Sequence, residues 1–191
     1  MTRSDFLSLG GFPFLLALTA MTQPDIEPET FLFADDGKIP NSKYPLLLYR
    51  KVFQATGSVG ALGMEERFAV NNWTNFWRDG VFPYHHYHSI THEVLGVYSG
   101  SALLQLGGEK GQKVRVQAGD VIVIPAGVGH KKLESSADFG VMGAYPDGRN
   151  YDLLRGEPGE RPQADKNIAA VPLPATDPLL GKEGGVTEFW K

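Results

Sequence analysis

Four short strand-like segments separated by glycine-containing turns occupy the middle of the chain, and they limit the fold more than any other feature. They cover residues 94–98, 102–106, 113–116 and 121–124. Many short strands at even spacing are typical of a β-sandwich or barrel of the jelly-roll kind. Helical periodicity is confined to residues 61–70. The sequence therefore predicts an all-β fold with one short helix.

Strand signals also precede this region. Residues 30–33 and 45–53 are apolar runs separated by the turn-forming sequence Asp35-Asp36-Gly37. Residues 73–77 alternate aromatic with polar side chains, and a period of two indicates a strand. We therefore expect N-terminal strands, then the helix, then a strand that leads into the central region.

Charge and cysteine content exclude several kinds of protein. The 191 residues include 18 basic and 22 acidic side chains and no cysteine. This balance offers no basic surface for DNA or RNA, so we expect no nucleic-acid partner. Without cysteine the chain has no disulfides, no thiolate nucleophile and no thiolate ligand for a metal.

All five histidines lie between residues 85 and 130, a concentration that ordinary core packing does not explain. His86 and His88 are two apart, so on a strand both side chains share one face. Three neutral imidazoles and one carboxylate suit Mn, Fe, Co, Ni or Zn, and they leave open positions for a substrate. A closed tetrahedral zinc site would instead be structural. We predict that one divalent ion binds His86, His88, Glu93 and His130.

The candidate ligands fall in two segments with regular spacing. The first runs Gly80-(five residues)-His86-Tyr87-His88-(four)-Glu93-(six)-Gly100. The second runs Gly119-(five)-Pro125-Ala126-Gly127-(two)-His130. These segments resemble the two motifs of the cupin family, which implies the cupin double-stranded β-helix, a jelly-roll barrel. Glu134 stands where the motif often has asparagine, which affects a local turn contact but no metal ligand.

Three other segments match a narrower group of proteins than the two motifs do. They read Tyr84-His85-His86-Tyr87-His88-Ser89, Ala144-Tyr145-Pro146-Asp147-Gly148 and Val171-Pro172-Leu173-Pro174. They look like the YjlB-type bacterial cupins. Because the motif pair occurs once, the chain is similar to single-cupin proteins. This resemblance implies a fold and a metal site but no particular substrate.

We expect residues 22–191 to form one cupin domain, with a motif core at 80–134. Residues 1–21 form an N-terminal extension, and Met21 is an alternative start. The apolar stretch 6–20 has the length of a signal-peptide core, but its charged start is weak and it is too short to span a bilayer. We therefore favour a cytoplasmic protein without a membrane anchor, with a signal peptide at residues 1–20 or a native extension as alternatives.

Residues 146–191 are rich in proline and glycine, which disfavours a helix or a central strand. We predict an extended arm laid over the barrel or over a neighbouring subunit, with residues 168–173 as an edge strand. A flexible linker is the alternative, but the arm contains apolar anchors that a linker does not need. We also predict a homodimer built partly by the N-terminal strands and this arm.

The sequence suggests Trp77 and Tyr84 as substrate-binding residues because they lie close to the first histidines of the motif, and His92 because it stands beside Glu93. Catalytic residues stay unassigned, although His92, Tyr84 and Glu134 are candidate acids or bases. A divalent ion with one carboxylate ligand keeps a net positive charge, which favours a small anionic ligand.

Three functions remain open. The first is a small-molecule metalloenzyme of the isomerase, decarboxylase or oxygenase type. The second is a non-catalytic, metal-dependent binding or sensing protein. The third is a structural barrel without a metal.

Overall fold

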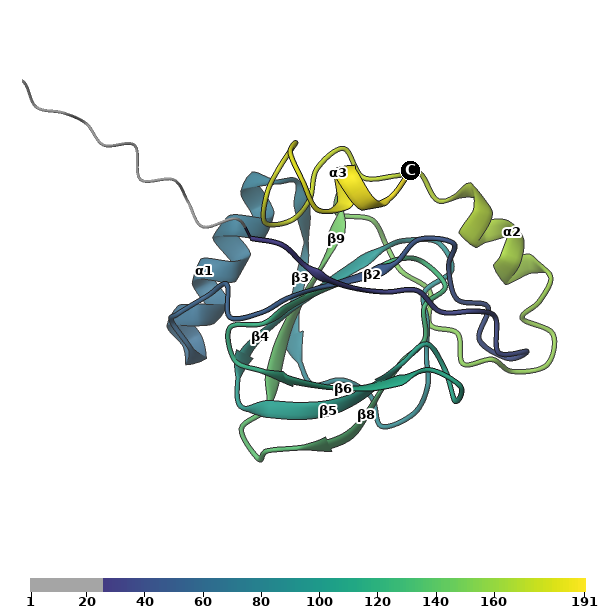
Figure 1. Cartoon of the computed structure of the whole chain (residues 1–191), viewed down its shortest axis with the longest axis horizontal. Helices are drawn as coiled ribbons and strands as arrows, with labels where there is room; N and C mark the ends of the chain where they lie inside the picture. The colour runs from purple at the N-terminus through teal and green to yellow at the C-terminus, as the bar shows by residue number, and fades with distance from the viewer. Residues whose placement is uncertain (1–25) are drawn as a thin grey trace, which may run out of the picture.

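Two antiparallel β-sheets face each other in the computed structural model, which describes residues 26–191 (Figure 1). The strands are β1 Glu29–Phe31, β2 Leu46–Tyr49, β3 Trp73–Asp79, β4 Glu93–Ser99, β5 Ser101–Leu106, β6 Gln112–Gln117, β7 Val121–Ile124, β8 His130–Ser135 and β9 Gly140–Pro146. The helices are α1 Gly57–Val70, α2 Gln163–Ala170 and α3 Val186–Phe189. The predictions for residues 1–21 lie outside the described residues.

The strand order confirms the predicted jelly roll. The larger sheet has the order β1-β2-β7-β4-β9-β3 and the smaller sheet has the order β6-β5-β8. From β4 onward the chain crosses repeatedly between the sheets, because β4, β7 and β9 belong to one and β5, β6 and β8 to the other. The four central segments predicted from the sequence are β4, β5, β6 and β7.

The inner strands of the six-stranded sheet are buried on both faces, whereas its edge strands β1 and β3 are partly exposed. Strands β2, β7 and β9 are buried along their whole length, whereas β6 in the smaller sheet alternates between exposed and buried residues. In β2, Leu48 packs into the core between the sheets and Leu47 packs into a second core on the outer face. Two covered faces explain why these strands read as continuous apolar runs.

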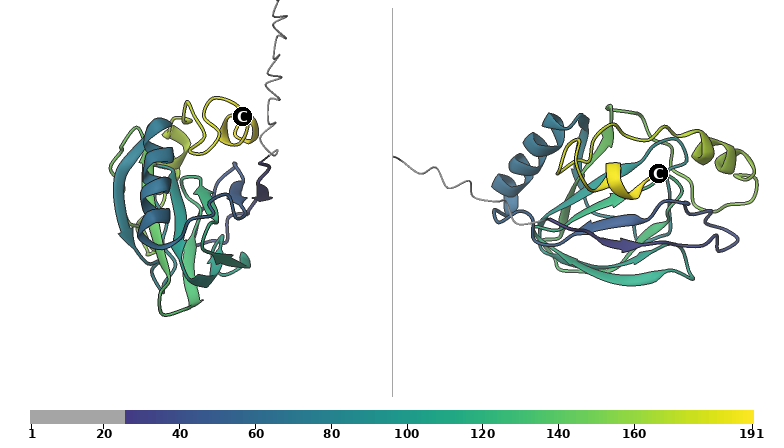
Figure 2. Two further views of the ribbon diagram at one scale, coloured as in Figure 1. Left: turned by 90° about the vertical axis from the view of Figure 1, so that its left-hand side faces the viewer. Right: turned by 45° about the horizontal axis from the view of Figure 1, so that its top comes forward.

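Helix α1 covers one part of this outer face (Figure 2). Met64 and Phe68 point from α1 into the outer core. A Cβ atom at Gly96 of β4 would lie 2.6 Å from Met64 Sδ, so glycine lets the helix approach the strand closely. The predicted helix, residues 61–70, is therefore correct in type but begins four residues too late.

The C-terminal arm covers another part of the outer face, which is one of the two positions predicted for it (Figures 1 and 2). Trp190 Nε1 donates to the Pro45 carbonyl at 2.8 Å, and Trp73 Nε1 donates to the Thr176 carbonyl at 2.9 Å. Asp177 is fully buried between the arm and the sheet. The arm therefore packs on its own barrel.

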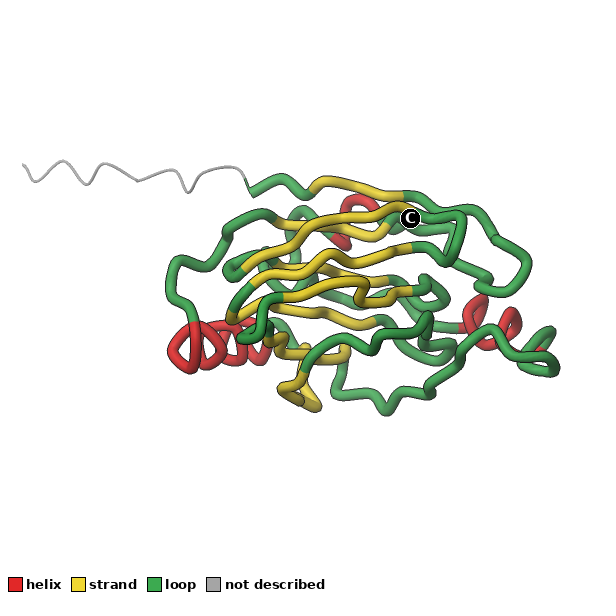
Figure 3. The backbone as a smooth tube through the Cα atoms, turned by 90° about the horizontal axis from the view of Figure 1, so that it is seen from below, coloured by secondary structure: helices red, strands yellow, loops and turns green. Residues whose placement is uncertain are grey.

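Two predictions about the arm are wrong. First, the arm contains α2 and α3, so the described residues hold three helices rather than one. Helices α1 and α2 lie at opposite ends of the strands (Figure 3). Second, residues 168–173 form no strand, because Ile168 belongs to α2. The prolines lie at the ends of α2 and not inside it: Pro162 is the N-cap and Pro172 follows the C-cap. The eight residues between the caps are free of proline and can form a helix. No helix among residues 26–191 is long and apolar enough to cross a membrane.

Candidate metal centre

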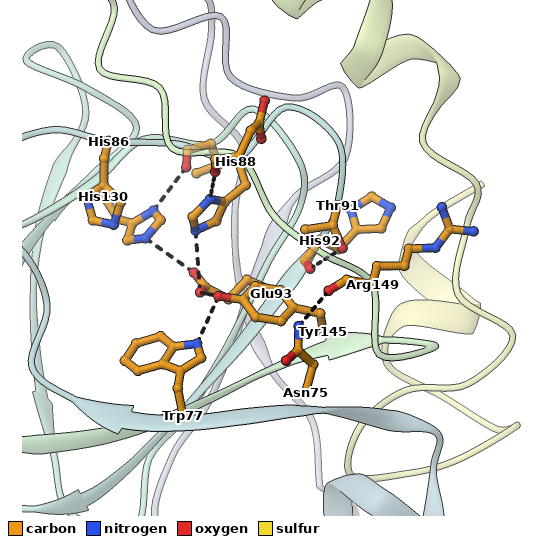
Figure 4. Close-up of polar contacts among 12 residues, drawn as sticks. Asn75, Trp77, His86, His88, Thr91, His92, Glu93, His130, Tyr145 and Arg149 are labelled. Atoms are coloured by element: carbon orange, nitrogen blue, oxygen red, sulfur yellow. Dashed lines mark hydrogen bonds and ion pairs between the residues drawn. The ribbon is translucent and has the colours of Figure 1, made fainter.

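Backbone pairing brings the three predicted histidine ligands together (Figure 4). His86 N donates to the His130 carbonyl at 3.2 Å, and His130 N donates to the His86 carbonyl at 3.0 Å. This antiparallel bridge places the two rings on one face, with centroids 3.9 Å apart, and His88 follows two residues later. One nitrogen from each buried ring lies within 4.8 Å of the others, so His86, His88 and His130 could hold a metal ion.

The other ring nitrogen of each histidine faces a backbone carbonyl. His86 Nδ1 lies 3.3 Å from the Tyr84 oxygen, and His130 Nδ1 lies 3.2 Å from the Val128 oxygen. His88 Nδ1 contacts the carbonyl oxygen of Asp152. A carbonyl only accepts, so each neutral ring carries its proton on Nδ1 and keeps the lone pair on Nε2. Such partners orient histidines that bind metals.

Glu93, the first residue of β4, lies beside these nitrogens and is almost fully buried. Its Oε1 is 3.4 Å from His88 Nε2, and its Oε2 is 3.3 Å from His130 Nε2. Oε1 also accepts a hydrogen bond from Tyr145 Oη at 3.0 Å. Oε2 has no hydrogen-bond partner among the described residues. A buried carboxylate oxygen without a donor is expensive unless a cation balances it.

The pKa values show how the cluster distributes charge. Burial raises the pKa of Glu93, but His88 and His130 outweigh this effect and hold it below its ordinary value. Burial lowers the pKa of His88, but Glu93 and the Asp152 carbonyl outweigh burial, so the net shift is upward. Burial and the neighbouring His130 lower the pKa of His86 to about 2. Glu93 is therefore an anion beside at least one imidazole that stays neutral.

A cavity of about 200 Å³ opens above the cluster. Its floor contains the three histidines and Glu93, and Trp77 and Tyr145 form one wall. Trp77 Nε1 donates to Tyr145 Oη at 2.8 Å, and this hydroxyl in turn donates to Glu93. A Cβ atom at Gly143 would lie 2.1 Å from Trp77 Cε2, so the indole can lie against β9 only because residue 143 is glycine.

The structure brings together some of the predicted site residues and not others. Trp77 lines the cavity with the four predicted ligands. Tyr84 lines a different surface cavity, where the Arg155 guanidinium lies over its ring at 4.1 Å. His92 faces the outer core, accepts from Ala126 N at 2.9 Å and packs on Trp190 with ring centroids 4.7 Å apart. Glu134 is exposed on β8.

Three residues near the cluster were not assigned to the site from the sequence. They are Tyr145, Tyr151 and Asp152. The Tyr145 and Tyr151 rings stack with centroids 5.0 Å apart, and Tyr151 also meets the His88 ring at 5.2 Å. Tyr145 occurs in a segment that resembles the cupin relatives, but nothing in its spacing points to Glu93.

Comparison with known proteins agrees with the fold and the motifs. Residues 73–133 match the family model described as a cupin domain. The chain is 49% identical over 166 residues to the uncharacterized protein YjlB of Bacillus subtilis (strain 168), covering 86% of this chain and 97% of that protein.

Two solved structures are more distant. An acireductone dioxygenase from Bacillus anthracis with a cadmium ion in its active centre is 17% identical with a TM-score of 0.36, covering 46% of this chain and 60% of that one. A predicted oxalate decarboxylase from Thermotoga maritima is 18% identical with a TM-score of 0.32, covering 64% of this chain and 93% of that one. Neither likeness supports an argument about function. By its motifs, its fold and its extensive identity to YjlB, the chain belongs to the cupin family.

Proposed function

We propose that this protein is a small-molecule metalloenzyme in which His86, His88, His130 and Glu93 bind one divalent cation. One observation carries the proposal: the Nε2 atoms of three buried histidines converge at the floor of a cavity, and each Nδ1 is held by a carbonyl. The donor set fits Mn, Fe, Co, Ni or Zn, because it contains only nitrogen and carboxylate oxygen. Glu93 Oε2, which lacks a donor, supplies the fourth ligand.

The protein groups around this position have distinct tasks. A bound divalent cation supplies a positive charge that polarises an oxygen of the substrate. Glu93 offsets part of that charge, and Tyr145 holds the carboxylate in place. Burial and the Glu93 charge raise the pKa of Tyr145, so its hydroxyl remains a hydrogen-bond donor at neutral pH. Trp77 orients that hydroxyl and excludes water from one side.

The cavity favours a small anion with an apolar substituent. Three neutral imidazoles and one carboxylate leave a divalent ion with a net positive charge, which attracts an oxyanion in a low-dielectric site. The mouth carries Phe82, Tyr151 and Leu153, whose exposed fractions are 45%, 50% and 41%. About 200 Å³ accommodates only a small molecule, since pockets for drug-sized ligands measure roughly 300 to 1,000 Å³. A carboxylate or 2-oxo acid with a short apolar chain fits both features.

A non-catalytic binding or sensing protein is the second candidate. The observation that favours it is the position of the predicted acids and bases: Tyr84, His92 and Glu134 do not line the cavity. Tyr145 and Tyr151 supply the hydroxyls that line the cavity, and of these Tyr145 already donates to Glu93. The isomerase, decarboxylase and oxygenase types of reaction all stay within the first proposal.

Elemental analysis and ligand titration test the proposal together. We expect one divalent ion per chain in the wild type and none retained after dialysis in His130→Ala, with Lys131→Ala as the matched surface control. Metal-loaded protein should bind a 2-oxo acid at least tenfold more tightly than its uncharged ester, about 1.4 kcal/mol. NMR of the same mixture separates the two functions, because an enzyme converts the acid and a binding protein returns it unchanged. Equal binding of acid and ester would contradict recognition by the cation.

The cytoplasmic location and the homodimer also remain proposals. Light scattering of the full chain should give twice the monomer mass, and a monomer would contradict the dimer.

A further inference from the structure

The three histidines of the cluster are oriented in two different ways. His86 and His130 each face the carbonyl of the residue two positions earlier, Tyr84 and Val128. The local backbone conformation alone sets those two contacts. His88 instead faces the carbonyl of Asp152, 64 residues further along the chain. Its orientation therefore depends on where the C-terminal arm lies.

The arm segment around Asp152 is fixed by pairing with the histidine segment. Tyr87 N donates to the Leu154 carbonyl at 2.9 Å, and Leu154 N donates to the Tyr87 carbonyl at 3.0 Å. This bridge brings residue 152 alongside His88. Tyr151 and Leu153 line the cavity on either side of Asp152 in the sequence.

The Asp152 carboxylate makes a second attachment to the residues that follow His88. Oδ1 accepts from Ser89 N at 2.6 Å and from Ile90 N at 3.3 Å, and Oδ2 accepts from Ser89 Oγ at 2.5 Å. Ser89 is fully buried, and its Oγ also accepts from Asn167 Nδ2 of α2 at 2.9 Å. One residue thus holds the backbone after His88 with its side chain and the His88 ring with its carbonyl.

We propose that Asp152 is a positioning residue for His88, through which the C-terminal arm completes the metal centre. The inference rests on the proposed metal site. The carboxylate fixes the arm on Ser89 so that the Asp152 carbonyl holds the proton of His88 on Nδ1 and directs Nε2 toward Glu93. Loss of the carboxylate releases the segment, and His88 can then rotate or change tautomer. Partners of this kind affect metal affinity about 10- to 100-fold.

The test measures Zn²⁺ affinity by calorimetry in Asp152→Ala, Asp152→Asn and Asp177→Ala, with melting temperatures of the metal-free proteins. Asp177→Ala is the matched control, because Asp177 is a carboxylate that anchors the distal arm on the outer face. We expect Asp152→Ala to weaken Zn²⁺ binding at least tenfold. Asp152→Asn should recover most of the affinity, because its amide oxygen can accept from Ser89 N. Asp177→Ala should lower the melting temperature but leave the affinity within threefold of the wild type.

NMR tests the role of Asp152 without a bound metal. In ¹H–¹⁵N NMR of the metal-free protein, the His88 Nδ1–H signal should be present in the wild type and lost in Asp152→Ala. If Asp152→Ala fails to fold, Ser89→Ala removes one of the same hydrogen bonds, the one from Ser89 Oγ to Asp152 Oδ2, and should show a smaller change in the same direction. An unchanged His88 signal together with an unchanged Zn²⁺ affinity overturns the inference, as does an equal loss of affinity in Asp177→Ala. A wild type that binds no Zn²⁺ overturns the proposed function, while the NMR result still decides the role of Asp152.

Discussion

Two buried carboxylates on opposite faces of the six-stranded sheet have very different surroundings. On the outer face, Asp177 accepts four hydrogen bonds, from Tyr49 Oη and from the backbone N–H groups of Leu179, Leu180 and Val186. On the inner face, Glu93 accepts one from Tyr145, and its Oε2 has no donor among the described residues. A fully bonded carboxylate holds structure together, whereas one with a free oxygen can bind a cation.

The largest effect should come from removing the outer carboxylate. Asp177→Ala leaves a buried hydroxyl, two buried N–H groups and one partly buried N–H group without an acceptor, which should cost about 3 to 5 kcal/mol of unfolding free energy. Chemical denaturation measures this loss, and Tyr49→Phe, which removes only one of the bonds, should cost about 1 kcal/mol. Similar stabilities for Asp177→Ala and the wild type would show that Asp177 does not hold the outer face together.

Replacing the inner carboxylate, Glu93, should affect metal affinity much more than stability. Glu93→Gln keeps the shape of the side chain but removes its charge, so we expect metal affinity to fall about 100-fold, equivalent to about 2.7 kcal/mol. The metal-free variant should lose far less stability than Asp177→Ala, because fewer groups depend on the carboxylate. Metal titration and denaturation of the same sample give both numbers. A Glu93→Gln variant that binds metal as tightly as the wild type would remove Glu93 from the ligand set.

The raised pKa of His88 predicts a pH dependence with a defined sign. A nitrogen must lose its proton to bind a metal, so affinity should fall about tenfold per pH unit as the pH drops below that pKa. Without metal the sign reverses: stability from protonated His88 is present below its unfolded pKa and is lost as pH rises through the raised folded pKa. In Glu93→Gln the charge that raises this pKa is gone, so the fall in affinity should move to lower pH. Metal titrations between pH 5 and 8 measure the shift, and an affinity that is constant over this range would contradict histidine ligation.

Tyr145 should have the smallest effect of the four. Tyr145→Phe removes the hydrogen bond from Tyr145 to Glu93 and the acceptor for Trp77, which should cost about 1 kcal/mol of stability. Metal affinity should change by less than tenfold, because the hydroxyl positions Glu93 and does not replace it. A loss as large as that of Glu93→Gln would show that the hydroxyl itself takes part in binding.

The cluster was largely predictable from the sequence because its geometry is local. The spacing of two between His86 and His88 sets their shared face, and the second motif supplies His130, whose backbone bridges to His86. Consecutive residues of an extended chain point to opposite sides, so His92 and Glu93 cannot both face the cavity. Glu93 faces the cavity, and His92 points to the other side and packs on Trp190.

The rest of the site could not be predicted, since it depends on the path of the arm. Nothing in the sequence around Asp152 shows that its carbonyl meets a histidine 64 residues earlier. Helix α2 was missed for a different reason. A count of prolines over the whole arm hides the fact that Pro162 and Pro172 flank a segment without proline.

The most direct test of a metal centre on the inner face is a crystal of the wild-type protein grown with Co²⁺ or Zn²⁺ and measured at the absorption edge of the metal. We predict one anomalous peak per chain from a metal ion bound by the Nε2 atoms of His86, His88 and His130, with a Glu93 oxygen as the fourth protein ligand. No peak at saturating metal, or a metal ion bound by other residues, would contradict this prediction.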